Sequence, residues 1–286
     1  MTARIGILGG SGLYDMPGLS AREERRIRTP FGDPSDALVL GELSGIPVAF
    51  LARHGRGHRI SPSEVPYRAN VYAFKTLGCD AILSASAVGS LREDLAPSHV
   101  CVPDQFIDRT RSRVDTFFRE GIVGHVSLAD PVCPSVSAVL AASARSAGAV
   151  VHEGGTYVCM EGPPFSTRAE SHLYRSWGAS VIGMTNLTEA KLAREAEICY
   201  GTMALVTDYD CWREATEDVS VDAVLAVLRG NAEMAGRALR DAVARVDPAR
   251  RCGCRDALRF AIVTDPALVP ERVRADLAPI LGSRLS

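Results

Sequence analysis

Two aspartates follow an apolar stretch in the second half of the chain. Residues 198–206 are rich in small and β-branched side chains, which indicates a buried strand, and Asp208 and Asp210 come directly after it. Side chains alternate along a strand, so both carboxylates are expected on the same side. One Asp would suffice to cap a turn, whereas a pair can offer two hydrogen-bonding groups to a ligand. Burial and mutual repulsion can also raise the pKa of one carboxyl group, which would then act as an acid near neutral pH.

Candidate anion-binding residues follow two earlier strands. The first strand, at 4–8, runs into Gly-Gly-Ser-Gly at 9–12, where backbone N–H groups can approach an anion closely and Ser11 adds a hydroxyl. This loop lacks the third glycine of a dinucleotide fingerprint and the Gly-Lys-Ser/Thr of a P-loop, and a simple tight turn would also explain it. Another strand ends at Arg53 and His54, and a planar guanidinium there suits a phosphate. A solvated basic loop is the alternative explanation.

Two further segments offer apolar contacts to a ligand. The proline-rich turn at 161–166 carries Phe165 near its tip, which is by default a core residue but could stack on a flat ligand. A long helix is predicted from residue 221 to about 246, and Val221, Val224 and Leu225 lie on one of its faces. That face could be an ordinary core stripe or the wall of an apolar pocket.

The cysteines and histidines show no metal-binding pattern. The chain has 8 cysteines and 6 histidines but no CxxC pair and no HExxH motif, so we expect no metal. Most cysteines lie in apolar segments, as small core residues do. Cys252 and Cys254 are the exception, because they lie close together in a polar linker and could form a disulfide. In a cytoplasm the reduced state is expected.

Composition excludes several classes of protein. The 286 residues carry a net charge of -2 with 23% charged residues, a balance that favours neither nucleic acid nor a membrane surface as a partner. No apolar segment reaches membrane-spanning length, and no leader-like segment follows the first residues. We therefore expect a cytoplasmic protein that acts on small molecules.

The order of predicted elements indicates an α/β fold. Apolar strand segments alternate with helices at 67–77, 134–147, 168–177 and 188–196, and the arginine-rich stretch at 109–124 is predicted to be a mobile loop. We expect one domain over residues 1–286 that ends in a tail at 247–286. Ligand sites of such folds collect at the carboxyl ends of strands. Five of the polar candidates lie at or just past such ends: Ser11, Arg53, Ser86, Thr185 and Asp208.

Six segments together resemble one known family. They are GGSGL at 9–13, ARHG at 52–55, SAVGSL at 86–91, DQFIDRT at 104–110, EGP at 161–163 and TDYDCW at 207–212. In this combination and order they closely resemble the methylthioadenosine phosphorylases, a family in the trimeric branch of the purine nucleoside phosphorylases. The resemblance extends from about residue 5 to residue 228 and weakens in the tail.

This resemblance implies a fold, a reaction and a set of site residues. The fold would be a three-layer α/β/α arrangement around a mixed central sheet, assembled as a homotrimer with the active site at the subunit interface. The reaction would be cleavage of 5'-methylthioadenosine by inorganic phosphate, a co-substrate, to adenine and 5-methylthioribose 1-phosphate in methionine and purine salvage, with no cofactor. The implied contacts are Ser11, Arg53, His54, Ser86, the Ala87 backbone and Thr185 for phosphate; Phe165 and Ser166 for the purine; Met184 for the ribose; and Val221, Val224, Leu225 and a neighbouring subunit's His125 for the 5' group.

The aspartate pair fits this chemistry. Glycosidic cleavage passes through an oxocarbenium-like transition state, which an anionic nucleophile beneath the sugar stabilises. Adenine leaves more readily when N7 is protonated, and Asp208 is the candidate acid. An ionised Asp210 would accept a hydrogen bond from the 6-amino group, whereas a 6-oxo purine would place two acceptors face to face. The sequence therefore predicts a preference for adenine nucleosides.

Other hypotheses stay open. The substrate could be another 5'-modified adenosine, such as a 5'-deoxy or 5'-halo compound, or the enzyme could be a broader purine nucleoside phosphorylase. A hydrolytic nucleosidase would use water and would not need the anion-binding residues. A nucleotide-binding protein without catalysis is a further alternative, and a nicotinamide-dependent dehydrogenase is disfavoured because the glycine fingerprint is missing.

Overall fold

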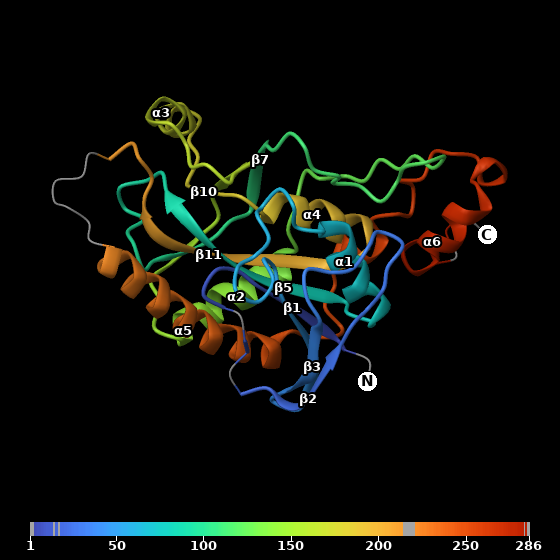
Figure 1. Cartoon of the computed structure of the whole chain (residues 1–286), viewed down its shortest axis with the longest axis horizontal. Helices are drawn as coiled ribbons and strands as arrows, with labels where there is room; N and C mark the ends of the chain where they lie inside the picture. Colours follow the sequence, from blue (N-terminus) through green and yellow to red (C-terminus); the bar gives the residue numbers. More distant parts are fainter. Residues whose placement is uncertain (1–2, 14, 17, 214–220, 283, 285–286) are drawn as a thin grey trace.

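One mixed sheet contains every strand in the part of the chain that the structure describes (Figure 1). The structure is a computed structural model that describes residues 3–13, 15–16, 18–213, 221–282 and 284, with only the backbone described for 221–225. The strands are β1 Ile5–Gly9, β2 Ser20–Arg25, β3 Leu38–Leu43, β4 Ile46–Ala52, β5 Ala81–Ser90, β6 Val100–Val102, β7 Gln105–Arg109, β8 Val151–Glu153, β9 Thr156–Met160, β10 Val181–Gly183 and β11 Cys199–Tyr209. The main path runs β2-β3-β4-β1-β5-β10-β9-β7, and β11, β6 and β8 branch from β5.

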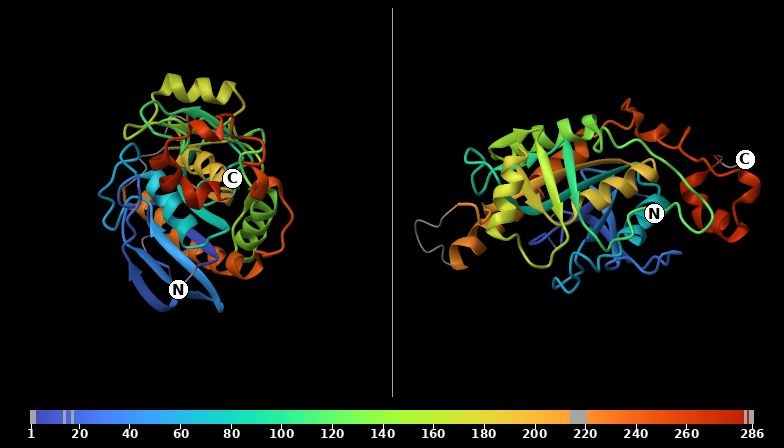
Figure 2. Two further views of the ribbon diagram at one scale, coloured as in Figure 1. Left: turned by 90° about the vertical axis from the view of Figure 1, so that its right-hand side faces the viewer. Right: turned by 90° about the horizontal axis from the view of Figure 1, so that it is seen from above.

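Helices cover both faces of the central strands. They are α1 Tyr67–Thr76, α2 Pro134–Ser146, α3 Arg168–Ser176, α4 Asn186–Glu195, α5 Val221–Arg245 and α6 Glu271–Leu281, with short 3-10 turns at η1 Gly253–Asp256 and η2 Pro266–Leu268. The helices α2 and α5 pack on one face, and α1 and α4 pack on the other (Figures 1 and 2). The predicted three-layer α/β/α fold with a mixed sheet is therefore confirmed.

Alternating burial along the central strands explains the layers. In β1, Ile5 and Ile7 join the core beneath α2 and α5, whereas Leu8 joins the core beneath α1 and α4. In β5, Leu83 joins the core beneath α2 and α5, and Ile82 joins the core beneath α1 and α4. Parallel strands that are buried on both faces need apolar side chains at every position, and this is why these segments read as continuous apolar runs.

Local signals set several helix ends where the sequence predicts them. The helix α1 stops before Gly78, whose φ of 89° is in the left-handed region that glycine adopts at little cost. Pro134 begins α2, because a first-turn residue needs no N–H donor. Thr167 and Glu170 form a reciprocal capping box at the start of α3.

The C-terminal tail packs back on the sheet domain. Val273 and Leu277 of α6 join the same core cluster as α1, and the Tyr72 hydroxyl donates to the Asp276 carbonyl at 2.8 Å. The tail lies at the end of the molecule opposite the carboxyl end of β11 (Figures 1 and 2). The prediction of a single domain over residues 1–286 stays a prediction. Among the described helices, none combines the length and the apolar character that a membrane span requires.

Candidate active site

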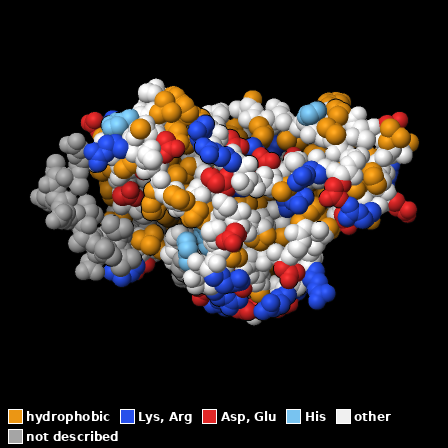
Figure 3. Space-filling view, turned by 45° about the horizontal axis from the view of Figure 1, so that its top comes forward, with side chains coloured by type: hydrophobic (Ala, Val, Ile, Leu, Met, Phe, Trp, Pro, Cys, Tyr) orange, Lys and Arg blue, Asp and Glu red, His pale blue; other side chains and the backbone are white. Residues whose placement is uncertain are grey.

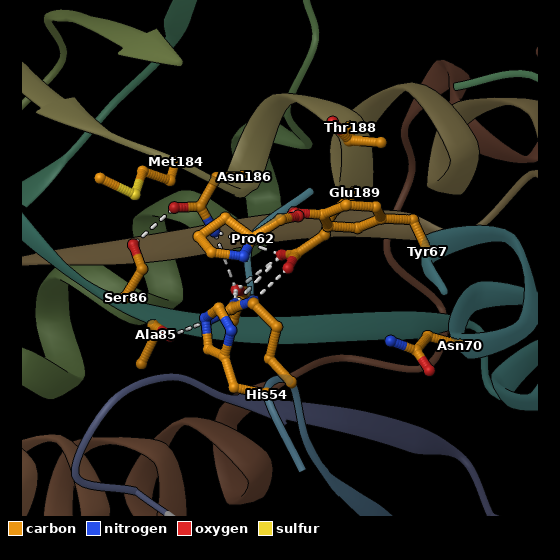
Figure 4. Close-up of polar contacts among 12 residues, drawn as sticks. His54, Pro62, Tyr67, Asn70, Ala85, Ser86, Met184, Asn186, Thr188 and Glu189 are labelled. Atoms are coloured by element: carbon orange, nitrogen blue, oxygen red, sulfur yellow. Dashed lines mark hydrogen bonds and ion pairs between the residues drawn. The ribbon is translucent and has the colours of Figure 1, made fainter. Parts of the chain in front are cut away.

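A buried polar network lies where β4, β5 and α4 meet (Figure 4). Arg53 follows β4, and its side chain forms an ion pair with Glu189 of α4 through Nε and Nη2. Its Nη2 also donates to the Ser84 Oγ at 2.7 Å, and its Nη1 donates to the Ala85 carbonyl at 3.0 Å. Burial alone would lower the pKa of Arg53, but the charge and hydrogen bonds of Glu189 raise it above the ordinary value. The guanidinium therefore stays charged in the interior.

Asn186 and Tyr200 complete this network. The Asn186 amide donates to the Tyr200 hydroxyl at 2.8 Å and accepts from the Ser86 Oγ at 2.5 Å. The Tyr200 hydroxyl in turn donates to Glu189 at 2.7 Å. Figure 4 shows Ser86, Asn186 and Glu189 pointing toward one another. A buried ion pair is tolerated only when its remaining lone pairs and protons are satisfied, and these partners provide that satisfaction.

The glycine loop after β1 reaches this network. A Cβ atom on Gly10 would lie 2.6 Å from the Ala85 carbonyl oxygen, 2.7 Å from Arg53 Nη1 and 3.1 Å from the Ser86 Cα. The structure thus brings together the loop, Arg53 and Ser86, although β5 continues to Ser90, so that Ser86 lies within the strand and not at its end as the sequence predicts. Glu189 occupies the Nε–Nη2 edge of Arg53, so that edge is not available to bind an anion. Nη1 is the guanidinium nitrogen that faces the loop.

We expect Gly10→Ala to damage the site through crowding. The added methyl group would press on the Ala85 backbone, and overpacking of this kind costs about 1–3 kcal/mol of stability. Displacement of the anion-binding groups by about 1 Å should lower kcat/KM on the order of 10²-fold. Steady-state kinetics and thermal melting would measure both effects.

Gly230→Ala in α5 is the matched control. A Cβ there meets nothing within 4 Å, and alanine favours a helix by about 1 kcal/mol over glycine. If Gly10→Ala keeps wild-type kcat/KM, the close approach of this loop is irrelevant to the site.

His54 and Thr185 flank the network. The His54 ring is buried, stacks on His58 at 4.5 Å and bonds the Ile60 carbonyl through Nδ1 at 2.9 Å. Burial, and then the charge of Arg53, lowers the pKa of His54 to about 4, so it is neutral at pH 7. A carbonyl only accepts, so Nδ1 carries the proton and Nε2 can only accept. Thr185 is the buried N-cap residue of α4, where the positive end of the helix dipole favours an anion.

The aspartate pair lies at the far end of β11. A bulge between Val206 and Asp208 shifts the register against β5. Asp210 is 8% exposed, and its Oδ2 has no hydrogen-bond partner among the described residues. Asp208 accepts from Thr207 Oγ1 at 2.6 Å and is open to solvent on one side, while the protein desolvates it on the others. This desolvation, opposed by the Thr207 bond and assisted by the Asp210 charge, raises the pKa of Asp208.

Phe165 and Ser166 lie beside this pair. The Cys211 thiol, one residue past Asp210, donates to the Ser166 carbonyl at 3.3 Å. The Phe165 side chain is 84% exposed, so its default explanation as a core residue is wrong. An exposed ring beside Ser166 is available to stack on a flat ligand.

Arg113 is a functional candidate that sequence reasoning missed. Its side chain donates to the Glu161 carbonyl at 2.6 Å, to the Tyr67 hydroxyl at 3.1 Å and to the Met184 carbonyl. The side chain is 1% exposed, so the prediction of a mobile loop at 109–124 is wrong around this residue. Met184 itself is half-buried against the turn at 161–163. Arg113 therefore connects that turn to Met184 by hydrogen bonds to both. No local signal separates Arg113 from the exposed arginines around it.

Among the 5'-pocket candidates, His125 lies in the described part of the chain, away from the carboxyl end of β11. His125 is exposed, and its backbone N–H donates to the Ala261 carbonyl of the tail at 2.8 Å, at the end of the molecule opposite Asp208. The helix α5 does begin at Val221, but the side chains of Val221, Val224 and Leu225 lie outside the described residues. Ala87 is half-buried on β5 next to Ser86.

Comparisons with known proteins identify the family of this chain. A family model described as the phosphorylase superfamily matches residues 4–244. Proteins named S-methyl-5'-thioadenosine phosphorylase are 59% identical in Geobacter sulfurreducens, over 98% of both chains, and 57% identical in Koribacter versatilis, over 99% of this chain and 97% of the relative. A solved methylthioadenosine phosphorylase from an antarctic soil metagenomic library has a TM-score of 0.94 at 51% identity, covering 98% of this chain and 99% of that one.

A more distant solved structure has the same fold. The methylthioadenosine phosphorylase from Schistosoma mansoni, solved in complex with tubercidin, has a TM-score of 0.81 at 36% identity, covering 98% of each chain. Identity above 50% over nearly the whole length confirms the resemblance that the six sequence segments indicated. The chain belongs to the phosphorylase superfamily and, within it, to the S-methyl-5'-thioadenosine phosphorylases.

Proposed function

We infer that this protein is a pentosyltransferase that cleaves S-methyl-5'-thioadenosine with inorganic phosphate, giving adenine and 5-methylthioribose 1-phosphate. The main support for this inference is the position of two groups of residues toward the carboxyl ends of β1, β4, β5 and β11. The glycine loop, Arg53 and Ser86 form an anion-binding corner, and Asp208 and Asp210 are two carboxylates in different environments. Phosphorolysis needs both an anion beneath the sugar and an acid at the leaving base. The names and identities of the relatives support the same reaction.

Phosphate is proposed to bind between the glycine loop and the start of α4. Ser11, Ser86 and Thr185 bring hydroxyl groups to this corner, and the Ala87 backbone, Arg53 and His54 lie around it. Arg53 supplies positive charge that Glu189 holds in place, rather than a free bidentate fork. A neutral His54 can accept a hydrogen bond from a protonated phosphate oxygen. Inorganic phosphate is then a co-substrate, and the reaction needs no cofactor.

Adenine is proposed to bind between Phe165 and the aspartate pair. Phe165 stacks on the base, and Ser166 lies beside it. The raised pKa of Asp208 suits a proton donor to N7. Asp210 is proposed to accept from the 6-amino group, because a buried carboxylate oxygen without a partner is costly until a donor reaches it.

The ribose and its 5' group are proposed to complete the site with help from a neighbouring chain. Met184 would lie under the ribose, and Val221, Val224 and Leu225 would contact the methylthio group. His125 lies too far along the molecule to join them within one chain, which supports a homotrimer with a shared site.

Large apolar side chains also reach solvent in the tail, where Phe260 is 85% and Val263 61% exposed, and Figure 3 shows apolar groups among the charged ones on one face. The cytoplasmic location stays a prediction.

Adenine release from S-methyl-5'-thioadenosine tests the reaction directly. We expect release only when inorganic phosphate is present, with catalytic efficiency falling from methylthioadenosine to adenosine to inosine. A buried methyl-sized group contributes about 0.8 kcal/mol to binding in an apolar pocket, which a hydroxyl does not. Liquid chromatography of the free base, with 5'-deoxyadenosine run in parallel, measures the order.

Other outcomes separate the alternatives. Release without phosphate would make the protein a nucleosidase. Equal efficiency with inosine would make it a broad purine nucleoside phosphorylase, and a clear preference for 5'-deoxyadenosine would identify another 5'-modified adenosine as its substrate. Tight adenine binding without turnover would leave a binding protein.

A further inference from the structure

Four cysteines that are far apart in the sequence converge at the opposite end of β11. Among the described residues, Cys133, Cys199, Cys252 and Cys254 bring their Sγ atoms within 4.8 Å of one another. Three of these side chains are buried and Cys252 is half-buried, and all four are free thiols. The candidate active site lies elsewhere, because Asp208 is nine residues along the strand from Cys199, a separation of about 30 Å.

The spacing of the sulfur atoms suits a single tetrahedral ion. A zinc ion binds thiolates at about 2.3 Å, which places the sulfurs of a tetrahedral site about 3.8 Å apart. The Cys199 and Cys252 sulfurs are 3.3 Å apart, and no pair in the group exceeds 4.8 Å, so the observed separations bracket that value. Four sulfur ligands leave no open coordination position, which is the pattern of a structural zinc site and not of a catalytic one.

Positive groups surround the sulfurs. Arg250 donates from Nε to the Cys199 Sγ at 3.2 Å, and Arg194 donates from Nη1 to the Cys254 Sγ at 3.8 Å. Cys133 is the N-cap residue of α2, where the helix dipole favours negative charge. Four thiolates around a divalent cation carry two excess negative charges, and Arg194 together with Arg250, which also pairs with Asp80 at 3.0 Å, offsets part of them. Hydrogen bonds from outside a metal site orient its ligands in this way.

We propose that Cys133, Cys199, Cys252 and Cys254 bind one zinc ion that fastens the C-terminal tail to the sheet. Two ligands come from the ends of α2 and β11, and the other two come from the start of the tail, next to and within η1. The tail carries Ala261, whose carbonyl holds the backbone of His125. Zinc would therefore add a fixed point at the start of a segment that α6 packing, the Arg255–Asp80 ion pair and the Gly124–Ile262 bridge hold further along.

This proposal replaces two expectations from the sequence. The sequence predicts no metal, because the chain has no CxxC pair, and it predicts that Cys252 and Cys254 are reduced, with a disulfide between the two as the alternative. In the folded chain, the Cys-x-Cys segment supplies two ligands and meets two cysteines that lie more than 50 residues earlier. Only the fold brings these four side chains together, so spacing in the sequence could not reveal them.

Metal analysis of the full chain tests the proposal. The protein is expressed with zinc in the medium, purified without a metal-affinity tag and measured by inductively coupled plasma mass spectrometry, with about one zinc per chain expected. A mercurial thiol reagent should release that zinc, and cobalt substitution should give the visible bands of a tetrahedral thiolate site. Cys252→Ser should lose the zinc, lower Tm by about 5 °C or more and speed proteolytic cleavage of the tail.

Cys79→Ala is the matched control, since Cys79 is a buried free cysteine outside the group. It should keep the full zinc content. If Cys252→Ser does not fold, the metal content, mercurial release and cobalt spectrum of the unmodified protein still decide the question. A metal-free protein whose four cysteines are reactive thiols, or which carries two disulfides among them, overturns the proposal.

Discussion

Replacing Asp208 with asparagine is expected to lower kcat/KM for S-methyl-5'-thioadenosine by roughly 10²- to 10⁴-fold, the usual contribution of a general acid. Asparagine keeps the size of the side chain and can donate a weak hydrogen bond to N7, but it cannot transfer a proton. The protein should remain folded, because Asp208 is exposed and its side chain accepts a hydrogen bond from the neighbouring Thr207. Asp33→Asn, at another exposed carboxylate, is the control and should keep wild-type activity.

The pH profile distinguishes proton transfer from simple loss of a contact. An acid acts while it is protonated, so kcat/KM should fall as pH rises through the pKa of Asp208, which desolvation has moved above its ordinary value. His54, whose pKa is about 4, cannot produce a change near neutral pH. Burial raises the pKa of Glu195 to about 7, so Glu195→Gln must be shown to keep the same alkaline fall. An unchanged profile in Asp208→Asn would remove Asp208 from the role of acid.

Asp210→Asn separates base recognition from proton transfer. The amide nitrogen can face the 6-oxo group of hypoxanthine, so the preference for methylthioadenosine over inosine should shrink by about tenfold or more, which corresponds to the loss of one buried hydrogen bond. The alkaline fall of the pH profile should persist in this variant. If the preference for adenine nucleosides stays at its wild-type ratio, the proposed contact between Asp210 and the 6-amino group is wrong.

Breaking the buried ion pair is expected to have the largest effect on stability. Glu189→Gln keeps the shape of the side chain but leaves the charge of Arg53 uncompensated in the interior. Loss of one partner of a buried pair typically costs about 3–5 kcal/mol. For a protein of this size that corresponds to a fall in Tm of about 10 °C. Thermal and denaturant unfolding would measure it.

A double replacement shows whether the pair serves stability or function. Arg53→Met with Glu189→Leu removes both charges and should recover part of the lost stability, because apolar residues often replace a buried pair without cost, although Ser84 and Tyr200 lose hydrogen-bond partners. The same variant should stay poorly active and need far more phosphate. Asp94→Asn, which breaks the exposed pair with Arg92, is the control and should cost at most about 1 kcal/mol. Full activity in the double variant would show that the pair is purely structural.

Local patterns in the sequence determined the class of fold and the places where ligands could bind. Continuous apolar segments predicted the central strands, because strands covered on both faces need apolar side chains throughout. The ends of helices, such as the one at Gly78, could also be predicted, because a helix end depends on a single residue and its neighbours. The strand-end positions of Ser11, Arg53 and Asp208 followed from these boundaries. The six family segments then indicated the reaction.

Tertiary structure alone decided which side chains act together. Glu189 reaches Arg53 across 136 residues of chain, and Arg113 contacts Met184 across 71 residues. Neither pairing leaves a periodic or spaced signal, because each depends on how helices pack against the sheet. Asp208 is exposed whereas Asp210, two residues later, is buried, a difference that alternation along a strand could not predict. The convergence of the four cysteines has the same cause. The packing of helices and strands decides which residues become neighbours in space, and the spacing of residues in the sequence does not reveal that packing.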